Sequence, residues 1–135
     1  MAKNPKVLIS GAGPVGLTLA NELVRHGISV RIVDKSAART DKSKALVLWS
    51  RTLELLDDAG YAEDFLSSGM PAHGAQISTG TQVMARVSFD LIDSRFAYAL
   101  MIAQSETERV LEERLAAAGV TVAGARRAFS LIGTG

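Results

Sequence analysis

Cysteine is absent from this chain of 135 residues. Its absence excludes disulfides, thiolate metal sites and cysteine nucleophiles, and it fits the reducing environment of the cytoplasm, where we expect the protein to reside. An excess of one charge is also lacking, because 15 Lys and Arg residues stand against 14 Asp and Glu residues. No net field favours nucleic acid or an anionic membrane, so we expect neither as a partner.

Long apolar runs are missing as well. The longest one, residues 96–103, is far shorter than the about 18 residues that a membrane-spanning helix needs. Residues 1–6 lack the apolar core of a signal peptide. Apolar residues nevertheless make up 47% of the sequence, which is enough to bury a sheet. We therefore expect one globular domain over residues 1–135, without an internal boundary.

The first 34 residues carry the clearest pattern of secondary structure. Residues 6–10 are an apolar run that ends in glycine, as in a strand buried within a parallel sheet. Between residues 14 and 26, apolar side chains recur at helical spacing, and Gly27 suits a left-handed stop. Residues 28–33 alternate and are rich in β-branched side chains. This βαβ order predicts an α/β, Rossmann-like domain with a parallel sheet.

The middle of the chain predicts two helices and a hairpin. Ser50 is a candidate N-cap for a helix that Gly60 ends, and a short helix is expected over residues 62–67. Two β-type runs, 75–78 and 83–89, flank a short turn. They predict a β-hairpin inserted into the Rossmann pattern.

The last part of the sequence predicts a helix and a third strand. Ser105 and Glu108 have the spacing of a capping box, in which the serine bonds a first-turn N–H and the glutamate bonds back to the serine. Gly119 suits the end of this helix. The apolar run at residues 120–123 predicts a strand, and the sequence of residues 124–135 predicts no helix or strand.

The most informative motif lies between the first strand and the first helix. Its sequence is Gly11-Ala12-Gly13-Pro14-Val15-Gly16, the GxGxxG fingerprint in the context that gives it meaning. Gly11 permits the tight turn, Gly13 allows a pyrophosphate to approach the backbone, and Gly16 allows close helix–strand packing. The helix N-terminus adds N–H donors and positive potential. The motif predicts a dinucleotide ligand and leaves FAD and NAD as alternatives.

An acidic residue stands where this ligand would place its adenosine ribose. Asp34 follows Gly16 by 18 residues, close to the about 20 expected for a carboxylate that accepts from a ribose hydroxyl. A 2′-phosphate would be repelled there. The predicted cofactor site therefore includes Asp34 and the adjoining Lys35 together with Pro14 and Val15 of the glycine loop.

Two further segments resemble the flavin-dependent aromatic hydroxylases, a family that includes para-hydroxybenzoate, phenol and polyketide hydroxylases. They are SRTLELL at residues 50–56 and QSETERVLEERL at residues 104–115. The resemblance runs from residue 6 to residue 123. It implies FAD as the cofactor, with Gly11, Gly13 and Gly16 at its pyrophosphate and Asp34 at its ribose.

The same resemblance implies roles for two more residues. Lys44 stands in a segment where the family usually has an arginine that meets the phosphates and the flavin. Lysine keeps the charge and loses the bidentate geometry. Gln104 matches a glutamine that contacts the ribityl chain and the flavin side of FAD.

The resemblance also implies an activity. NADH or NADPH would reduce FAD, and O2 would supply an oxygen atom to an aromatic or polyketide-type substrate. The Asp-Gly and Gly-Asp dipeptides of later family motifs do not occur in this sequence. We therefore expect an incomplete N-terminal part of a longer enzyme, lacking later strands and the substrate domain. We expect it to contain no catalytic residue or metal ligand and to be inactive alone.

Other readings of the residues stay open at this point. An NAD-binding oxidoreductase would share the fingerprint, although a Tyr-x-x-x-Lys pair is missing because Phe65 and Ile102 stand four residues after Tyr61 and Tyr98. A non-catalytic dinucleotide-binding fragment is a second alternative, and a homodimer is an open assembly state.

Overall fold

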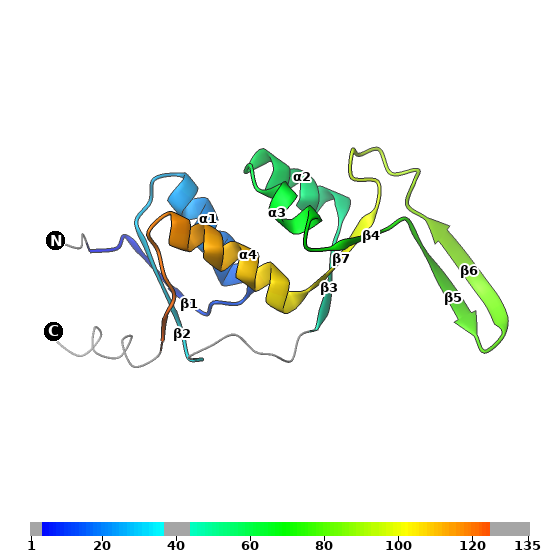
Figure 1. The fold of residues 1–135 in the computed structure, drawn as a ribbon, viewed down its shortest axis with the longest axis horizontal. Helices are drawn as coiled ribbons and strands as arrows, with labels where there is room; N and C mark the ends of the chain where they lie inside the picture. The colour runs from blue at the N-terminus through cyan, green and yellow to red at the C-terminus, as the bar shows by residue number, and fades with distance from the viewer. Residues whose placement is uncertain (1–3, 37–43, 125–135) are drawn as a thin grey trace. The chain divides into compact units, whose positions relative to one another are not determined.

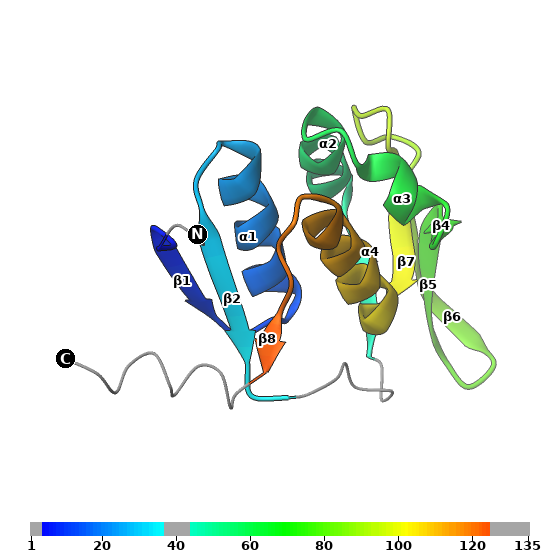
Figure 2. The same cartoon turned by 60° about the vertical axis from the view of Figure 1, so that its left-hand side comes forward.

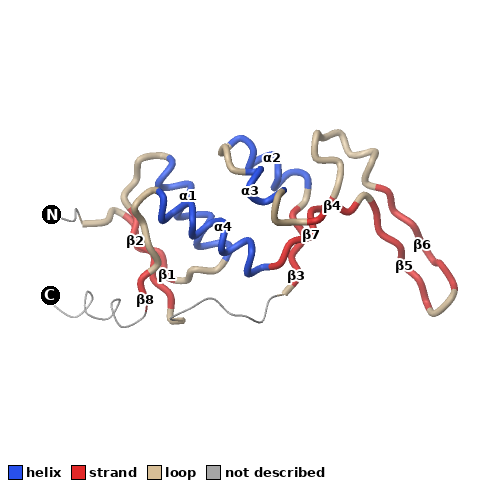
Figure 3. The backbone as a smooth tube through the Cα atoms, in the orientation of Figure 1, coloured by secondary structure: helices blue, strands red, loops and turns tan. Residues whose placement is uncertain are grey.

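A computed structural model describes residues 4–36 and 44–124. The chain forms two compact units, of which the first contains residues 1–43 and 104–135 and the second contains residues 44–103. Figure 1 follows the described elements from the N-terminus to the C-terminus by colour, and Figure 3 separates helices from strands.

The first unit contains a parallel three-stranded sheet. Its strands are β1 (Val7–Ser10), β2 (Val30–Asp34) and β8 (Ala123–Gly124). β2 lies between the other two, as Figure 2 shows, and pairs with both in parallel. The predicted α/β class and parallel sheet are confirmed. The third strand pairs with β2 only at residues 123 and 124, slightly later than the predicted run.

Two helices of the first unit pack against each other. They are α1 (Pro14–Arg25) and α4 (Gln104–Ala117). Leu17 of α1 and Leu111 and Leu115 of α4 are almost fully buried, and each such side chain contributes about 1.5–3 kcal/mol through removal from water. Asn21 bridges the helices, because its Nδ2 donates to the carbonyl oxygens of Leu17 at 2.9 Å and Leu111 at 3.0 Å.

The second unit contains an antiparallel sheet that the sequence does not predict. Its strands are β3 (Ala45–Leu48), β7 (Ala99–Ala103) and β4 (Met70–Ala72), with β7 in the centre. The same unit contains α2 (Ser50–Asp58) and α3 (Ala62–Leu66). Leu53 of α2, Phe65 of α3 and Leu100 of β7 are its most deeply buried large side chains.

A hairpin of β5 (Gly74–Thr79) and β6 (Gln82–Ser88) completes the second unit, as predicted. Gly80 takes the left-handed conformation in its turn. On one face, Arg86 Nε donates to Gln76 Oε1 at 3.0 Å. Every residue of both strands is exposed.

Two predicted helix starts are wrong, that of α2 by one residue and that of α4 by two. Trp49 is the N-cap of α2, so Ser50 is its first helical residue and not its cap. α4 begins at Gln104, which makes Ser105 its second residue instead of its N-cap. The predicted glycine stops are confirmed, since Gly27, Gly60 and Gly119 have φ values of 72°, 82° and 82°.

Candidate dinucleotide site

The glycine loop connects β1 to α1 in a tight turn. Gly11 has a φ of 106°, a conformation that an L side chain would strain. Its N–H donates to the carbonyl oxygen of Val33 at 2.8 Å, which ties the loop to the end of β2. A Cβ atom at Gly16 would overlap the carbonyl oxygen of Gly11. Glycine at position 16 is therefore required for the helix to pack against the loop.

The same loop leaves room for a ligand beside Gly13. A Cβ atom at Gly11 or Gly13 would meet nothing within 4 Å. Gly13 is the N-cap of α1 and has no side-chain cap, and the first backbone bond into the helix is that from Leu17 N–H to Gly13 oxygen, at 3.0 Å. The N–H groups of Val15 and Gly16 precede it, and Pro14 has none to satisfy. Open space and N–H donors at a helix N-terminus fit a pyrophosphate.

The carboxylate of Asp34 is anchored by the backbone at both oxygens. Its Oδ2 accepts from Ala12 N–H at 2.7 Å and its Oδ1 accepts from Ser36 N–H at 2.7 Å. The Ala12 bond, followed by the Ser36 bond, lowers the pKa of Asp34, since hydrogen bonds to the charged form favour it. Each ionised oxygen keeps a further acceptor position, which fits a ribose hydroxyl.

The structure brings together only part of the predicted site. Gly11, Gly13, Gly16 and Asp34 are linked through the Ala12 bond in the first unit. Val15 is 85% exposed, and Lys35 is exposed beside Asp34. Lys44 is an exposed residue that precedes β3 in the second unit.

Gln104 is the first residue of α4 in the first unit. It bonds to Glu108, which the capping-box pattern had paired with Ser105. Its Nε2 donates to Glu108 Oε1 at 2.9 Å. Glu108 is 6% exposed, and neighbouring Thr107 is 4% exposed with no hydrogen-bond partner for its Oγ1 among the described residues. The spacing of four residues between Gln104 and Glu108 could have indicated this contact. The capping-box pattern drew attention to Ser105 instead.

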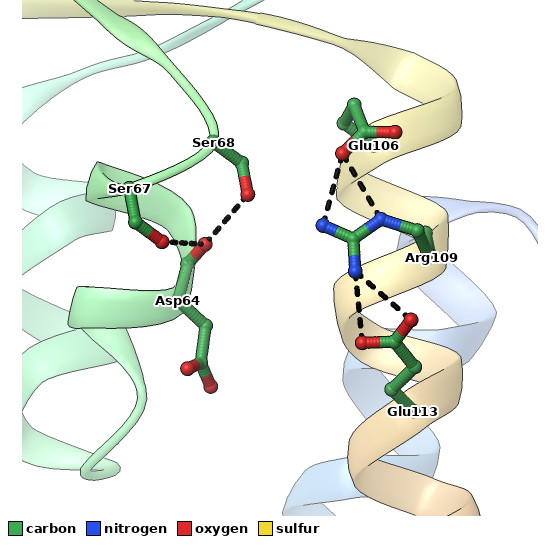
Figure 4. A network of polar contacts seen from close by, with 6 residues as sticks. All are labelled: Asp64, Ser67, Ser68, Glu106, Arg109 and Glu113. Carbon is green, nitrogen blue, oxygen red and sulfur yellow. Dashed lines mark hydrogen bonds and ion pairs between the residues drawn. The ribbon is translucent and has the colours of Figure 1, made fainter.

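The opposite side of α4 carries an ion-pair network, drawn in Figure 4. Arg109 binds Glu106 at 2.9 Å and Glu113 at 2.8 Å, and these two carboxylates raise its pKa. A separate group in the second unit closes α3, where the hydroxyls of Ser67 and Ser68 donate to the Asp64 carbonyl oxygen at 3.2 and 3.0 Å. All of these polar groups have protein partners, so they serve the fold.

Residues 4–36 and 44–124 contain no group of three or more His, Cys, Asp or Glu side chains arranged to hold a metal ion. Within the same described ranges, no helix has the length and apolar character needed to cross a membrane.

Two similar proteins of known name are both monooxygenases. 6-Methylpretetramide 4-monooxygenase of Streptomyces rimosus is 38% identical over 123 residues, a match that covers 90% of this chain and 22% of that protein. Pentachlorophenol 4-monooxygenase of Sphingobium chlorophenolicum is 34% identical, with 82% of this chain and 21% of that protein covered. The chain thus spans about a fifth of the length of these relatives.

The fold has a solved counterpart. The crystal structure of p-nitrophenol 4-monooxygenase PnpA from Pseudomonas putida DLL-E4 superposes with a TM-score of 0.80 at 23% identity, covering 86% of this chain and 30% of that one. The model of a family described as FAD binding domain matches residues 4–134. The chain therefore belongs to this family of FAD-binding domains.

Proposed function

We propose that residues 1–135 form the N-terminal FAD-binding part of a flavin-dependent monooxygenase. The whole protein would hydroxylate an aromatic or polyketide-type substrate in the cytoplasm, using O2 and NADH or NADPH. Support for the activity comes from two relatives that are named monooxygenases. Support for the cofactor comes from the family match and from the Asp34 carboxylate bonded to the glycine loop. The latter is the structural observation that carries the proposal.

The residues of this chain would bind and orient FAD. The loop from Gly11 to Gly16, including Pro14 and Val15, would hold the pyrophosphate through backbone N–H groups. Asp34 would accept from the adenosine ribose, with Lys35 adding positive potential beside it. Lys44 would meet phosphate or flavin, and Gln104 would contact the ribityl chain and flavin. Bound FAD supplies the redox chemistry, and no residue of this segment is assigned a proton-transfer role.

A competition experiment tests cofactor binding. The loop and Asp34 address the ADP half of FAD, so ADP should displace FAD from the chain, whereas FMN should not. The measurement is the amount of radiolabelled FAD that the chain retains in equilibrium dialysis as each competitor is added. NAD serves as a third competitor, because its ADP half is the same. Displacement by FMN but not by ADP would contradict the placement of the ligand.

A chimera tests the proposed activity. Residues 1–135 would replace the matching segment of pentachlorophenol 4-monooxygenase, and the purified chimera would be assayed for bound flavin and for oxidation of pentachlorophenol. We expect a yellow, active protein. The matched control is the same chimera with Asp34→Asn, which should retain less flavin. A folded chimera without flavin, judged by circular dichroism and absorbance, would contradict the proposal.

A further inference from the structure

The buried face of α4 changes in character along its length. Residues 104, 107, 108, 111 and 115 fall on one side of a helix, given its 100° rotation per residue. The later positions on this side are Leu111 and Leu115, both 1% exposed. The earlier positions are Gln104, Thr107 and Glu108. Buried polar groups cost free energy unless they are bonded, so this polar end of the buried face requires an explanation.

The bond between Gln104 and Glu108 fixes which way the amide of Gln104 faces. An ionised carboxylate only accepts hydrogen bonds. The amide must therefore present its NH2 group to Glu108, as it does at 2.9 Å. Its Oε1 atom is then turned away from Glu108, because oxygen and nitrogen occupy opposite sides of the planar amide. The chemistry of the carboxylate thus decides an orientation that a glutamine alone leaves open.

We infer that Glu108 is a positioning residue that makes Gln104 a hydrogen-bond acceptor toward the FAD ribityl chain. This inference rests on the proposed function, in which Gln104 contacts FAD. Hydroxyl groups of the ribityl chain are donors that match an acceptor at Oε1. A Gln104 without Glu108 would populate both amide orientations, and only one of them presents the acceptor.

Glu108 can act on FAD binding without contacting FAD itself. A buried carboxylate close to a phosphate would repel it, whereas one bonded to an amide of the same helix acts through that amide. Glu108 is separated from Gln104 by one helical turn, and its described bond is to Gln104. The role assigned to Glu108 is therefore indirect.

Removal of the acceptor tests the inference. Glu108→Leu keeps a side chain suited to a buried helical position and removes the bond to Gln104. It should weaken FAD affinity about fivefold to tenfold, equivalent to one hydrogen bond. Glu108→Gln keeps the size of the side chain but offers both a donor and an acceptor, so it no longer fixes the Gln104 amide and should also leave the FAD affinity below that of wild type. Glu113→Leu is the matched control, since Glu113 lies on the opposite side of α4 and is exposed; it should leave the affinity unchanged.

A double-mutant cycle separates positioning from a general structural effect. With Gln104→Ala already present, Glu108→Leu should cause no further loss of FAD affinity. NMR gives a second readout without cofactor. The sequence has only three glutamines, Gln76, Gln82 and Gln104, so Gln104→Ala identifies the side-chain NH2 signals of Gln104. Glu108→Leu should shift those signals and leave the Gln76 signals in place.

The outcomes distinguish this inference from the proposed function. Equal losses from Glu108→Leu with and without Gln104 would overturn the positioning role, as would unchanged Gln104 NH2 signals. An FAD affinity that Glu108→Leu leaves unchanged would also overturn the inference, while leaving the proposed function intact. A folded chimera that carries residues 1–135 and retains no flavin would overturn the proposed function, and the ligand-facing role of the pair with it.

Discussion

Ala12 and Asp34 join the loop after β1 to the end of β2 through one hydrogen bond, from the Ala12 N–H to Asp34 Oδ2 at 2.7 Å. Ala12 lies between the first two glycines of the loop, and Asp34 is the last residue of β2. One carboxylate thereby fixes the loop geometry and its own orientation. It is held in place before a ribose is present, which lowers the cost of ordering the site on binding.

Asp34→Asn should weaken both the fold and the proposed cofactor site. The amide of asparagine has one acceptor oxygen, so it cannot accept from both the Ala12 and Ser36 N–H groups in the present geometry. We expect a loss of about 1 kcal/mol in the free energy of unfolding, since the carboxylate is partly exposed, and weaker FAD binding. Urea denaturation and FAD titration measure the two effects. Asp58→Asn, at an exposed position of α2, is the control and should change neither.

The Asp34 bonds also predict how stability depends on pH. Backbone N–H groups of Ala12 and Ser36 lower the folded-state pKa below the reference value of 3.8. The unfolded chain then takes up a proton at higher pH than the folded chain does. The contribution of Asp34 is therefore complete above the unfolded pKa and is lost as pH falls through the folded pKa. The difference in urea midpoint between wild type and Asp34→Asn should shrink as pH is lowered from about 5 to about 2.5. A constant difference would contradict this.

Two glycines of the loop should respond to substitution in opposite ways. At Gly16, an added Cβ would overlap the Gly11 carbonyl oxygen, so Gly16→Ala should cost about 1–3 kcal/mol of unfolding free energy. At Gly13, an added side chain meets open space, and its φ of −77° suits any residue. Gly13→Val should therefore fold normally and lose FAD binding, because its side chain occupies the space proposed for pyrophosphate. A Gly13→Val chain that binds FAD like wild type would show that the phosphates lie elsewhere.

The βαβ unit and its fingerprint could be predicted because their signals are local. Glycine positions, helical spacing and β-branched alternation all occur within 34 residues. β7 was not predicted, since residues 96–103 are apolar without alternation, and their strand character comes from pairing with β3 and β4 on both sides. Such pairing between distant segments leaves no local pattern.

The N-cap of α2 shows how packing overrides local preference. Serine is the better capping residue, yet Trp49 takes that position with extended backbone angles of −82° and 161°. Its ring packs edge-on against Phe89 with centroids 5.5 Å apart. The extended angles at residue 49 are those that an N-cap residue normally adopts, so the helix begins at Ser50. The Gln104–Glu108 bond was missed for a related reason, because sequence alone does not locate the first helical residue.

The free edge of β1 predicts self-association. Among the described residues, β1 pairs with β2 on one side only. A strand with unpaired N–H and C=O groups is a template for another chain, and its Leu8 side chain is 55% exposed. We expect the 135-residue chain to form dimers or larger species as its concentration rises, which light scattering and sedimentation velocity would detect.

A charge on this strand should suppress the association. Natural edge strands use lysine to prevent pairing, so Leu8→Lys should shift the chain toward monomer. Leu91→Lys is the matched control, because Leu91 is 93% exposed and lies outside every strand; the same gain of charge there should leave association unchanged. If both variants disperse the chain equally, general solubility explains the effect and the β1 edge does not. A wild-type chain that stays monomeric at all concentrations, binding FAD at nanomolar strength, on the order of 12 kcal/mol, would instead identify these residues as a self-sufficient flavoprotein.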